Sequence, residues 1–428
     1  MTDPAQASLA RRGPLRSDFA MSSATSSARS ILWVAIIAAA ATSSLAMGIR
    51  QTFGLLLLPL AAEHEIAPWA FGLAVALHNL TWGLAQPISG SMADKHGSGR
   101  VMAFGGVFYL IGCGLPALMP SNLTIMIGIG FFSGLGVACA GTGLALAAIG
   151  RLAPPEKRGE YIGIASAGGS LGQAAMVPIT FSAIGGFGAA GALAMLAISA
   201  VLIIPIARNI EWRPAPRTGA PAAGLMGLPG LARRSLADRD FALLTGGFFA
   251  CGFQLAFLTT HLPSHIALCG QPAALGMMVM MMIGLFNIPG SWFCGWLSTR
   301  IKPETGLGWI YLARTVAIAA FAIAPPSEWG TILFAAVMGF VWLGTVPLTS
   351  AAIARRFGVG DLGALYGVCF FSHQIGGFLG AGSGAVLMAW TGSYAAFWPV
   401  MIVVGLTASV LNWMAKAPGA RGTLATAG

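Results

Sequence analysis

Charged residues are scarce in this chain. Asp, Glu, Lys and Arg make up 8% of its 428 residues, whereas they make up about 25% of an ordinary soluble protein. Hydrophobic residues account for 56% of the chain, and its mean hydropathy is +0.79. This composition excludes an ordinary soluble domain and indicates an integral membrane protein.

Patterns typical of reactive or metal-binding sites are also missing. The six cysteines are scattered with no CxxC or metal-ligand spacing, so they are interpreted as small core residues. Glycine-rich stretches such as "GGSLGQ" lack the Gly-Lys-Ser/Thr of a phosphate loop and fit close contacts between helices. The sequence therefore predicts neither an enzyme nor a cofactor. The cysteines are Cys113, Cys139, Cys251, Cys269, Cys294 and Cys369.

Long apolar stretches are what the sequence does have. About 20 consecutive apolar residues cross a bilayer as a helix, and twelve stretches satisfy this requirement. We therefore expect an all-α membrane protein with twelve transmembrane helices. The predicted spans are 31–61, 69–93, 101–120, 123–149, 160–184, 188–207, 241–267, 273–298, 306–325, 329–352, 362–388 and 394–415.

Positive charge is distributed unevenly between the connecting segments. Of the 23 Lys and Arg residues, 21 lie in the terminal segments or in loops after even-numbered spans, whereas loops after odd-numbered spans carry only Glu63, Glu65 and Glu328. The positive-inside rule then places both termini in the cytoplasm. The same rule accounts for the net charge of +10 without a nucleic-acid partner. We expect a multi-pass protein of an inner (plasma) membrane, acting as a monomer in the lipid bilayer.

The chain divides into two halves of six spans. A stretch rich in Pro, Gly and Arg, "EWRPAPRTGAPAAG", lies between the sixth and seventh spans and indicates a flexible cytoplasmic linker. A gapless offset of 204 residues aligns the halves at Phe53 with Phe257, Pro59 with Pro263, Arg151 with Arg355 and several glycines. The predicted organisation is a disordered tail at 1–30, a first bundle at 31–210, a linker at 211–240, a second bundle at 241–416 and a tail at 417–428.

The loop after the second span carries a family motif. The sequence "GSMADKHGSGR" resembles the loop signature of the major facilitator superfamily, with Gly90, Asp94, Gly97 and Arg100 at the required positions. Met92 replaces the leucine of that signature, and its trailing basic pair is interrupted. The resemblance implies two six-helix bundles related by a parallel repeat, with a substrate site between them. It also implies a gate in which Asp94 meets the start of the eleventh span, near Leu362.

A narrower resemblance points to one branch of that superfamily. The stretches "FGLLLLPLAAE" and "KRGEYIGIASAGGSLGQ" are similar to the monocarboxylate porters and oxalate–formate antiporters. The acidic-glycine motif that animal monocarboxylate carriers place before their first span is absent. The Asp/Arg pair of their eighth span is also absent, because "MIGLFNIPGSWFCGW" is uncharged. The proton-coupling scheme of those carriers therefore does not transfer to this chain.

Two arginines remain inside the predicted spans, Arg50 and Arg314, and all 13 acidic residues lie outside the predicted hydrocarbon core. Arg50 is near mid-membrane, where a charge costs at least about 2.5–3.5 kcal/mol. An anionic substrate can offset that cost, and helix-end carbonyls or water are the alternative partners. Arg314 lies in the ninth span, which in this fold usually lies outside the cavity. A structural role is therefore favoured for Arg314, and a second anion contact is the alternative.

Polar side chains at other mid-span positions complete the candidate site. Asn79 shares a helical face with Trp82 and Gln86, and Gln254 shares a face with His261. His373 titrates near physiological pH and is a candidate for proton coupling. Each lone His or Gln is equally compatible with a bond between helices. The predicted substrate-binding residues are Arg50, Gln51, Asn79, Gln254, His261, His373 and Gln374.

Together these features predict a secondary transporter of a small, monocarboxylate-like organic anion. Rocking of the two halves would give alternating access, driven by proton symport or by anion exchange. The alternative is an efflux carrier for a drug-like compound or metabolite. The absence of an acidic residue from the middle of the spans argues against a cationic drug.

Overall fold

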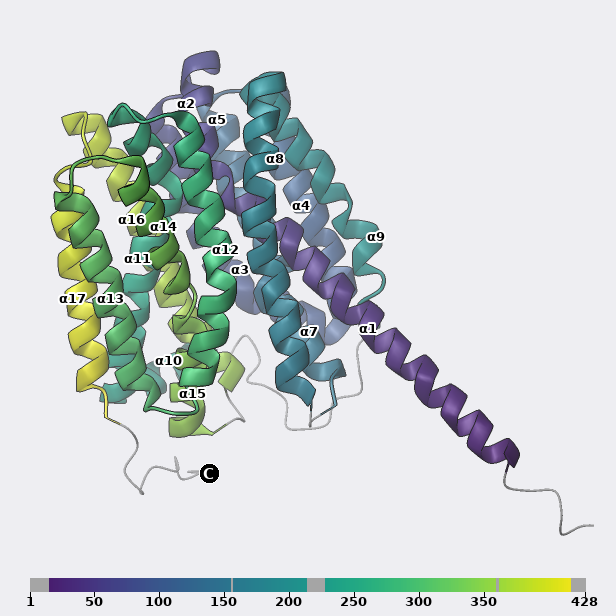
Figure 1. Cartoon of the computed structure of the whole chain (residues 1–428). Helices are drawn as coiled ribbons and strands as arrows, with labels where there is room; N and C mark the ends of the chain where they lie inside the picture. Colours follow the sequence, from purple (N-terminus) through teal and green to yellow (C-terminus); the bar gives the residue numbers. More distant parts are fainter. Residues whose placement is uncertain (1–14, 155–156, 214–227, 359–361, 417–428) are drawn as a thin grey trace, which may run out of the picture.

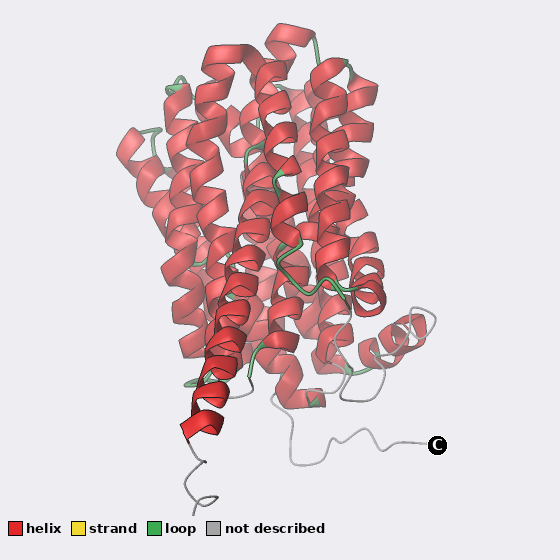
Figure 2. Cartoon of the chain, turned by 90° about the vertical axis from the view of Figure 1, so that its right-hand side faces the viewer, coloured by secondary structure: helices red, strands yellow, loops and turns green. Residues whose placement is uncertain are grey.

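The computed structural model describes residues 15–154, 157–213, 228–358 and 362–416, and all of its regular structure in these ranges is helical. Most helices run nearly parallel through one bundle (Figure 2). The helices are α1 (Leu15–Gln51), α2 (Phe53–His64), α3 (Pro68–His96), α4 (Ser98–Leu118), α5 (Asn122–Ile125), the π-helical segment η2 (Met126–Phe132), α6 (Ser133–Ala140), α7 (Thr142–Leu152), α8 (Arg158–Val201), α9 (Ile203–Ala207), α10 (Leu228–Leu236), α11 (Arg239–Leu268), α12 (Ala273–Leu297), α13 (Pro303–Ile323), α14 (Glu328–Phe340), α15 (Thr345–Phe357), α16 (Leu362–Thr391) and α17 (Phe397–Met414).

Ten helical segments of the described chain are long and apolar enough to cross a membrane. One of them, Glu160–Ala207, contains Gly188 in a non-helical conformation with φ 70° and ψ −179°. The chain reverses there and returns toward α9, so this segment accounts for two of the predicted spans (Figure 1). Helix α3 falls outside the ten but has 29 residues, enough to cross the bilayer. Splitting the segment at Gly188 and counting α3 gives the twelve predicted spans.

Hydrophobic packing follows the order of the chain. One core cluster draws nearly all of its residues from 241–415, and two others draw nearly all of theirs from 36–210. Figure 1 shows the purple-to-teal helices on one side of the bundle and the green-to-yellow helices on the other. The boundaries predicted for the two bundles stay a prediction.

Two helices extend into segments predicted to be irregular. Helix α1 begins at Leu15, so residues 15–30 of the predicted disordered tail are helical, and they project beyond the bundle in Figure 1. Helix α10 lies within the predicted linker 211–240. Within these predicted segments, residues 1–14, 214–227 and 417–428 lie outside the described residues.

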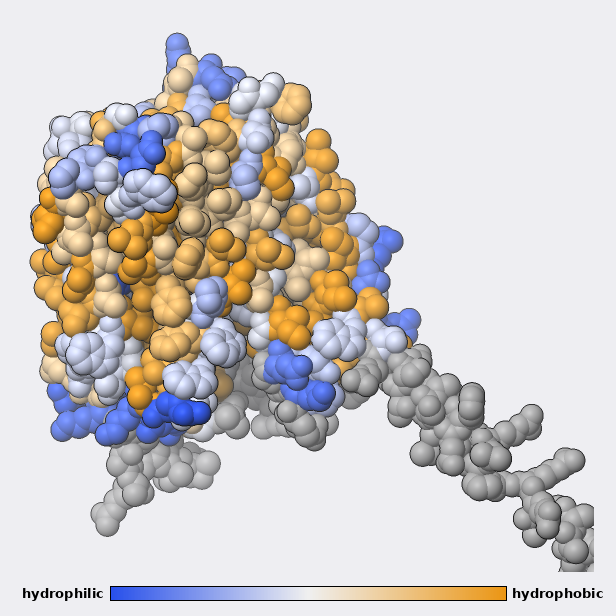
Figure 3. Space-filling view, in the orientation of Figure 1, coloured by the Kyte–Doolittle hydropathy of each residue, from blue (hydrophilic) through white to orange (hydrophobic). Residues whose placement is uncertain are grey.

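The two ends of the bundle differ in charge, and the surface between them is apolar. The end that carries Lys95, Arg151, Arg300 and Arg356 is called the basic end here. The opposite end, which carries Glu63, Glu65 and Glu328, is called the acidic end. Figure 3 shows a hydrophobic band above the blue residues of the basic end. Large apolar side chains such as those of Phe187, Trp329 and Trp390 are exposed on the outside, as expected for residues that face lipid.

Contacts between the halves are tight toward the acidic end and absent at several positions of the basic end. A Cβ atom on Gly54 of α2 would collide with the carbonyl oxygen of Thr259 in α11, and one on Gly72 of α3 would collide with Ala385 in α16. At the basic end, a Cβ on any of four glycines would meet no atom within 4 Å, among the described residues. The halves are therefore in close contact at Gly54 and Gly72 of the acidic end, and the four basic-end glycines have open space beside them. The four glycines are Gly90, Gly163, Gly363 and Gly367.

Two spans contain a helix break at matching points of the two halves. Helix α6 ends at Ala140, and α7 begins at Thr142 after an extended Gly141 (φ −74°, ψ 177°). Helix α14 ends at Phe340, and α15 begins at Thr345. The offset of 204 places Gly141 opposite Thr345. The predicted spans 123–149 and 329–352 are therefore broken helices.

Candidate functional site

Arg50 lies near the end of α1 and keeps most of its hydrogen-bonding capacity. Its Nη2 donates to the Asn79 Oδ1 atom over 3.4 Å, which is long for a hydrogen bond. Its Nε has no partner among the described residues, although the atom is buried. The side chain is partly exposed, and its guanidinium carbon lies 5.2 Å from the centre of the Trp82 ring. Arg50 is therefore held by one weak polar bond and one aromatic face.

One face of α3 positions these partners. The Asn79 Nδ2 atom donates to the carbonyl oxygen of Val75 over 2.8 Å, which turns Oδ1 toward Arg50. The Trp82 Nε1 atom donates to Gln86 Oε1 over 2.8 Å and fixes the orientation of the indole. The i, i+3 and i+7 spacing seen in the sequence thus brings Asn79, Trp82 and Gln86 to one side of the helix.

Helix α16 brings residues of the other half to the same place. A Cβ on Gly377 would lie 3.0 Å from Asn79, and one on Gly83 would lie 2.7 Å from the Cβ of Gln374. The His373 Nδ1 atom lies 3.2 Å from Gln374 Oε1. The Gln374 Nε2 atom is buried without a partner in the described structure. The structure thus packs Gln374 and Gly377 of α16 against Gly83 and Asn79 of α3. The His373 ring lies against Phe248 of α11 and Phe370 of its own helix.

Three predicted site residues point elsewhere. Gln51 faces α12, where its Nε2 lies 3.9 Å from the Met280 sulfur. Gln254 turns into the interior of its own half and donates to the carbonyl oxygen of Met401 over 3.1 Å. His261 uses both ring nitrogens, at 3.0 Å from the Tyr394 hydroxyl and 2.8 Å from the Ala381 carbonyl oxygen. The structure does not bring these three side chains to the Arg50 group.

Arg314 is bound to the backbone at the break between α14 and α15. Its Nη2 donates to the carbonyl oxygens of Val341 and Trp342 over 2.7 and 2.9 Å, and the side chain is fully buried. Asn287 holds the same break, because its Oδ1 accepts from the Leu343 N–H over 3.1 Å. The Asn287 Nδ2 atom also donates to Ser170 of the first half over 2.9 Å. Arg314 Nε and Nη1 have no partner among the described residues, and the structural role favoured for Arg314 stays a prediction.

The motif predicted to form a gate occupies the basic end. Arg151 joins Asp94 at 3.4 Å to Glu211 at 3.0 Å. Gly97 makes the turn between α3 and α4 with φ 91°, and Arg100 lies over the Trp212 ring at 5.8 Å. Sequence reasoning did not identify Glu211, which the fold brings back beside the motif. Residues 359–361, just before α16, are not described, so the predicted contact of Asp94 with that helix stays a prediction.

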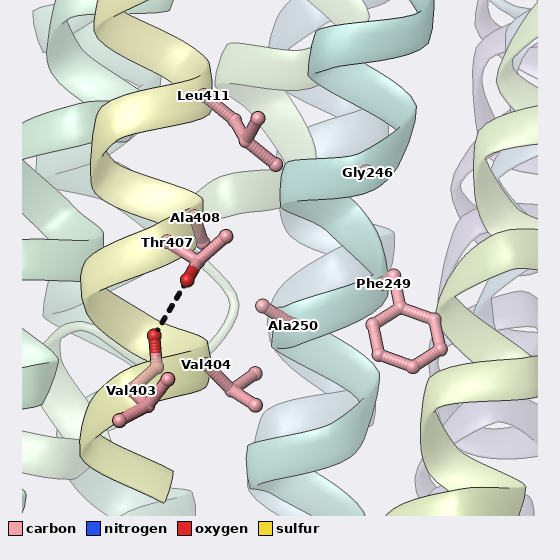
Figure 4. Close-up of a pocket in the computed structure, with 8 residues that line it drawn as sticks. All are labelled: Gly246, Phe249, Ala250, Val403, Val404, Thr407, Ala408 and Leu411. Atoms are coloured by element: carbon pink, nitrogen blue, oxygen red, sulfur yellow. Dashed lines mark hydrogen bonds between the residues drawn. The ribbon is translucent and has the colours of Figure 1, made fainter. Parts of the chain in front are cut away.

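A separate pocket lies between α11 and α17 (Figure 4). Its lining includes Phe249, Val404 and Leu411 and contains no charged residue. Its single hydroxyl, on Thr407, already donates to the carbonyl oxygen of Val403 over 2.8 Å. This pocket suits an apolar group and offers nothing to bind an anion.

Comparisons with known proteins agree with this architecture. The model of the Major Facilitator Superfamily matches residues 32–381. The chain is 24% identical to monocarboxylate transporter 13 of Rattus norvegicus over 377 residues, 85% of this chain and 84% of that protein. It is 24% identical to the oxalate:formate antiporter of Oxalobacter formigenes over 358 residues, covering 83% and 84%. The structure of a D-xylose–proton symporter superposes with a TM-score of 0.66 at 15% identity, covering 91% of this chain and 98% of that one. The fold and the family match together show that this multi-pass membrane protein belongs to the Major Facilitator Superfamily of transporters and is not an enzyme.

Proposed function

We propose that this protein transports a small organic monocarboxylate and that Arg50 binds the carboxylate. The carrying observation is that Arg50, in the middle of a membrane span, is partly exposed and retains a buried Nε without a partner among the described residues. A charge at that depth costs about 2.5–3.5 kcal/mol on insertion scales, and an exchangeable anion can offset this cost. A guanidinium suits a carboxylate because its planar fork donates two parallel hydrogen bonds.

The relatives support an anionic substrate. Two of them are named for monocarboxylates and for oxalate and formate. In the proposed mechanism, His373 beside Gln374 accepts a proton during symport, or a second anion exchanges at Arg50. Asn79 orients the guanidinium in either case, because its own amide nitrogen is fixed to Val75.

Alternating access would follow from the unequal contacts of the two ends. In the described structure the halves meet closely at Gly54 and Gly72 of the acidic end, whereas Gly90 and Gly363 of the basic end have open space beside them. We infer that the basic end faces the cytoplasm, following the distribution of Lys and Arg. The group formed by Asp94, Arg151 and Glu211 would then rearrange when that end closes.

A counterflow panel in proteoliposomes tests the proposal. Proteoliposomes that contain the full chain would be loaded with labelled lactate, pyruvate, oxalate, formate or a neutral amino acid in separate experiments. We expect exchange of carboxylates and none of the amino acid. Exchange of neutral or cationic compounds alone would overturn the anion model.

A further inference from the structure

The number of available cations limits the number of carboxylates that the substrate can carry. Only Arg50 and Arg314 are basic residues within the spans. Arg314 is fully buried and donates to two backbone carbonyls at a helix break. Arg50 therefore remains as the single arginine of the site, and one guanidinium matches one carboxylate.

Aromatic rings lie next to Arg50 and continue across to the second half. The Trp82 ring lies 5.2 Å from the Arg50 guanidinium carbon and 5.2 Å, edge to face, from the Phe370 ring. His373 stacks on Phe370 at 5.7 Å with an interplanar angle of 7°. These rings form an aromatic row, defined here as Trp82, Phe370 and His373, that begins on α3 and ends on α16.

Few polar groups remain to recognise the rest of a substrate. The Trp82 N–H and the Asn79 amide nitrogen are already bonded within α3. Among the described side chains of this region, the buried polar atoms left without a partner are Arg50 Nε, His78 Nε2 and Gln374 Nε2. A polyhydroxylated substrate needs more hydrogen-bonding groups than these, whereas a carboxylate on a flat apolar body does not.

We propose that the substrate is an aromatic monocarboxylate, with its carboxylate on Arg50 and its ring against the aromatic row. This inference rests on the proposed function and narrows it. Offset and edge-to-face contacts between rings give such a ligand a geometry that a short aliphatic acid cannot use. A dicarboxylate would leave its second charge without an arginine in the site.

Competition and counterflow with matched probes test this assignment. The full chain in proteoliposomes would be given benzoate, its neutral isostere benzamide, the dicarboxylate terephthalate, the saturated analogue cyclohexanecarboxylate, and lactate. We expect benzoate to exchange with a half-saturating concentration about tenfold lower than that of lactate, a ratio within reach of one aromatic contact. Benzamide and terephthalate should neither exchange nor compete.

The Trp82→Leu variant separates the aromatic contact from the anion contact. It should raise the KM for benzoate about tenfold more than it raises the KM for lactate, because both substrates use Arg50 but only benzoate uses the ring contact, while Trp82→Phe should retain most of the affinity for benzoate. Trp292→Leu is the matched control, because Trp292 is 74% exposed on α12. If Trp82→Leu fails to fold, Trp82→Phe and the probe series still decide the result.

The outcomes distinguish this inference from the function on which it rests. Exchange of lactate or oxalate in preference to benzoate would overturn the aromatic assignment and leave the anion proposal standing. Absence of exchange for every carboxylate would overturn both. Equal affinity for benzoate and cyclohexanecarboxylate would show that an apolar body is sufficient and would overturn the aromatic assignment.

Discussion

The two arginines inside the membrane spans differ in what takes their hydrogen bonds. Arg314 is fully buried, and one of its amino groups donates to the carbonyl oxygens of Val341 and Trp342. Arg50 is partly exposed and makes one long bond to the amide of Asn79. Unpaired donors alone do not separate the two arginines, because Arg314 Nε and Nη1 also lack a partner among the described residues. The difference is that Arg314 is tied to the backbone and sealed from outside, whereas Arg50 is partly exposed and makes no backbone bond in the described structure.

The helix breaks explain why the second half needs its arginine. The last carbonyls of a helix lack intrahelical partners and carry partial negative charge, and in a membrane they must be satisfied internally. The break after α14 is four residues wide, Val341–Gly344, whereas the matching break after α6 is Gly141 alone. In the first half a hydroxyl is sufficient, since Ser89 donates to the Ala138 carbonyl oxygen over 2.8 Å.

Replacing Arg50 tests the functional side of the comparison and should have the largest effect. Arg50→Gln removes the charge but keeps a polar group, so we expect transport to fall roughly 100-fold, in line with the loss of a charge-assisted hydrogen bond. The stability of the substrate-free protein should not fall, because an uncompensated charge leaves the membrane interior. Counterflow and thermal unfolding in detergent measure the two effects, with Arg50→Lys as the control that keeps the charge. Normal transport by Arg50→Gln would refute the assignment.

Replacing Arg314 tests the structural side. Arg314→Met keeps much of the side-chain length but leaves the carbonyls of Val341 and Trp342 unpaired, so we expect a loss of roughly 2–4 kcal/mol in the free energy of unfolding. The KM of the folded fraction should stay near that of the wild type. A stable Arg314→Met protein that no longer binds substrate would show that Arg314, and not Arg50, is the substrate-binding arginine.

Asn287 sharpens the comparison, because it hydrogen-bonds the backbone of the same helix break as Arg314 but carries no charge. Asn287→Ala leaves the Leu343 N–H unpaired and breaks the bond to Ser170, which should cost about 1–3 kcal/mol. Ser170→Ala removes only the bond between the halves and should cost less. Thermal unfolding of both variants checks this order, and a larger loss for Ser170→Ala would contradict it.

The smallest effect concerns the basic end, outside both arginine sites. Asp238 caps α11 by accepting from the Phe241 N–H over 2.9 Å, and it accepts from Arg356 over 2.6 Å. Partial burial would raise the pKa of Asp238, but the hydrogen bonds from Arg356 and from the Phe241 N–H, with the charge of Arg356, together outweigh it and hold that pKa below the usual value.

A depressed folded-state pKa gives a defined sign for the effect of pH. The stabilisation by Asp238 is present above the unfolded pKa of aspartate and is lost as the pH falls through the lowered folded pKa. For this partly exposed pair we expect less than about 1 kcal/mol. When unfolding is measured from neutral to acidic pH, the wild type should lose this small part of its free energy of unfolding. The Asp238→Asn variant should not show that loss. An identical pH profile for the two proteins would contradict the prediction.

Local patterns predicted the spans, the repeat and the face of α3, because periodicity and charge are properties of neighbouring residues. Asn79 and Trp82 share a face by helical geometry alone, and Arg50 could be predicted to lack an acidic partner because no Asp or Glu lies in the middle of a predicted span. The superfamily was predicted correctly from the loop motif and the repeat.

Partners distant in the chain could not be predicted in the same way. Gln254 and His261 do share a helical face, but which neighbour that face meets depends on how α11 packs against α16 and α17. The carbonyls that bind Arg314 become available only because α14 ends at Phe340, and no proline or charge marks that position. Glu211 reaches Arg151 through the folding of a segment 60 residues away.

The glycines with open space at the basic end also make the protein convenient to observe. At Gly90 of α3 and Gly363 of α16, no described atom lies within 4 Å of the point where a side chain would begin. A cysteine introduced there could carry a spin label or a fluorophore without displacing a neighbour. Gly54 and Gly72 at the acidic end offer no such room. Spectroscopic distances between labels on α3 and α16 can therefore follow the basic end as it opens and closes. At the acidic end, labels must be attached to residues other than Gly54 and Gly72.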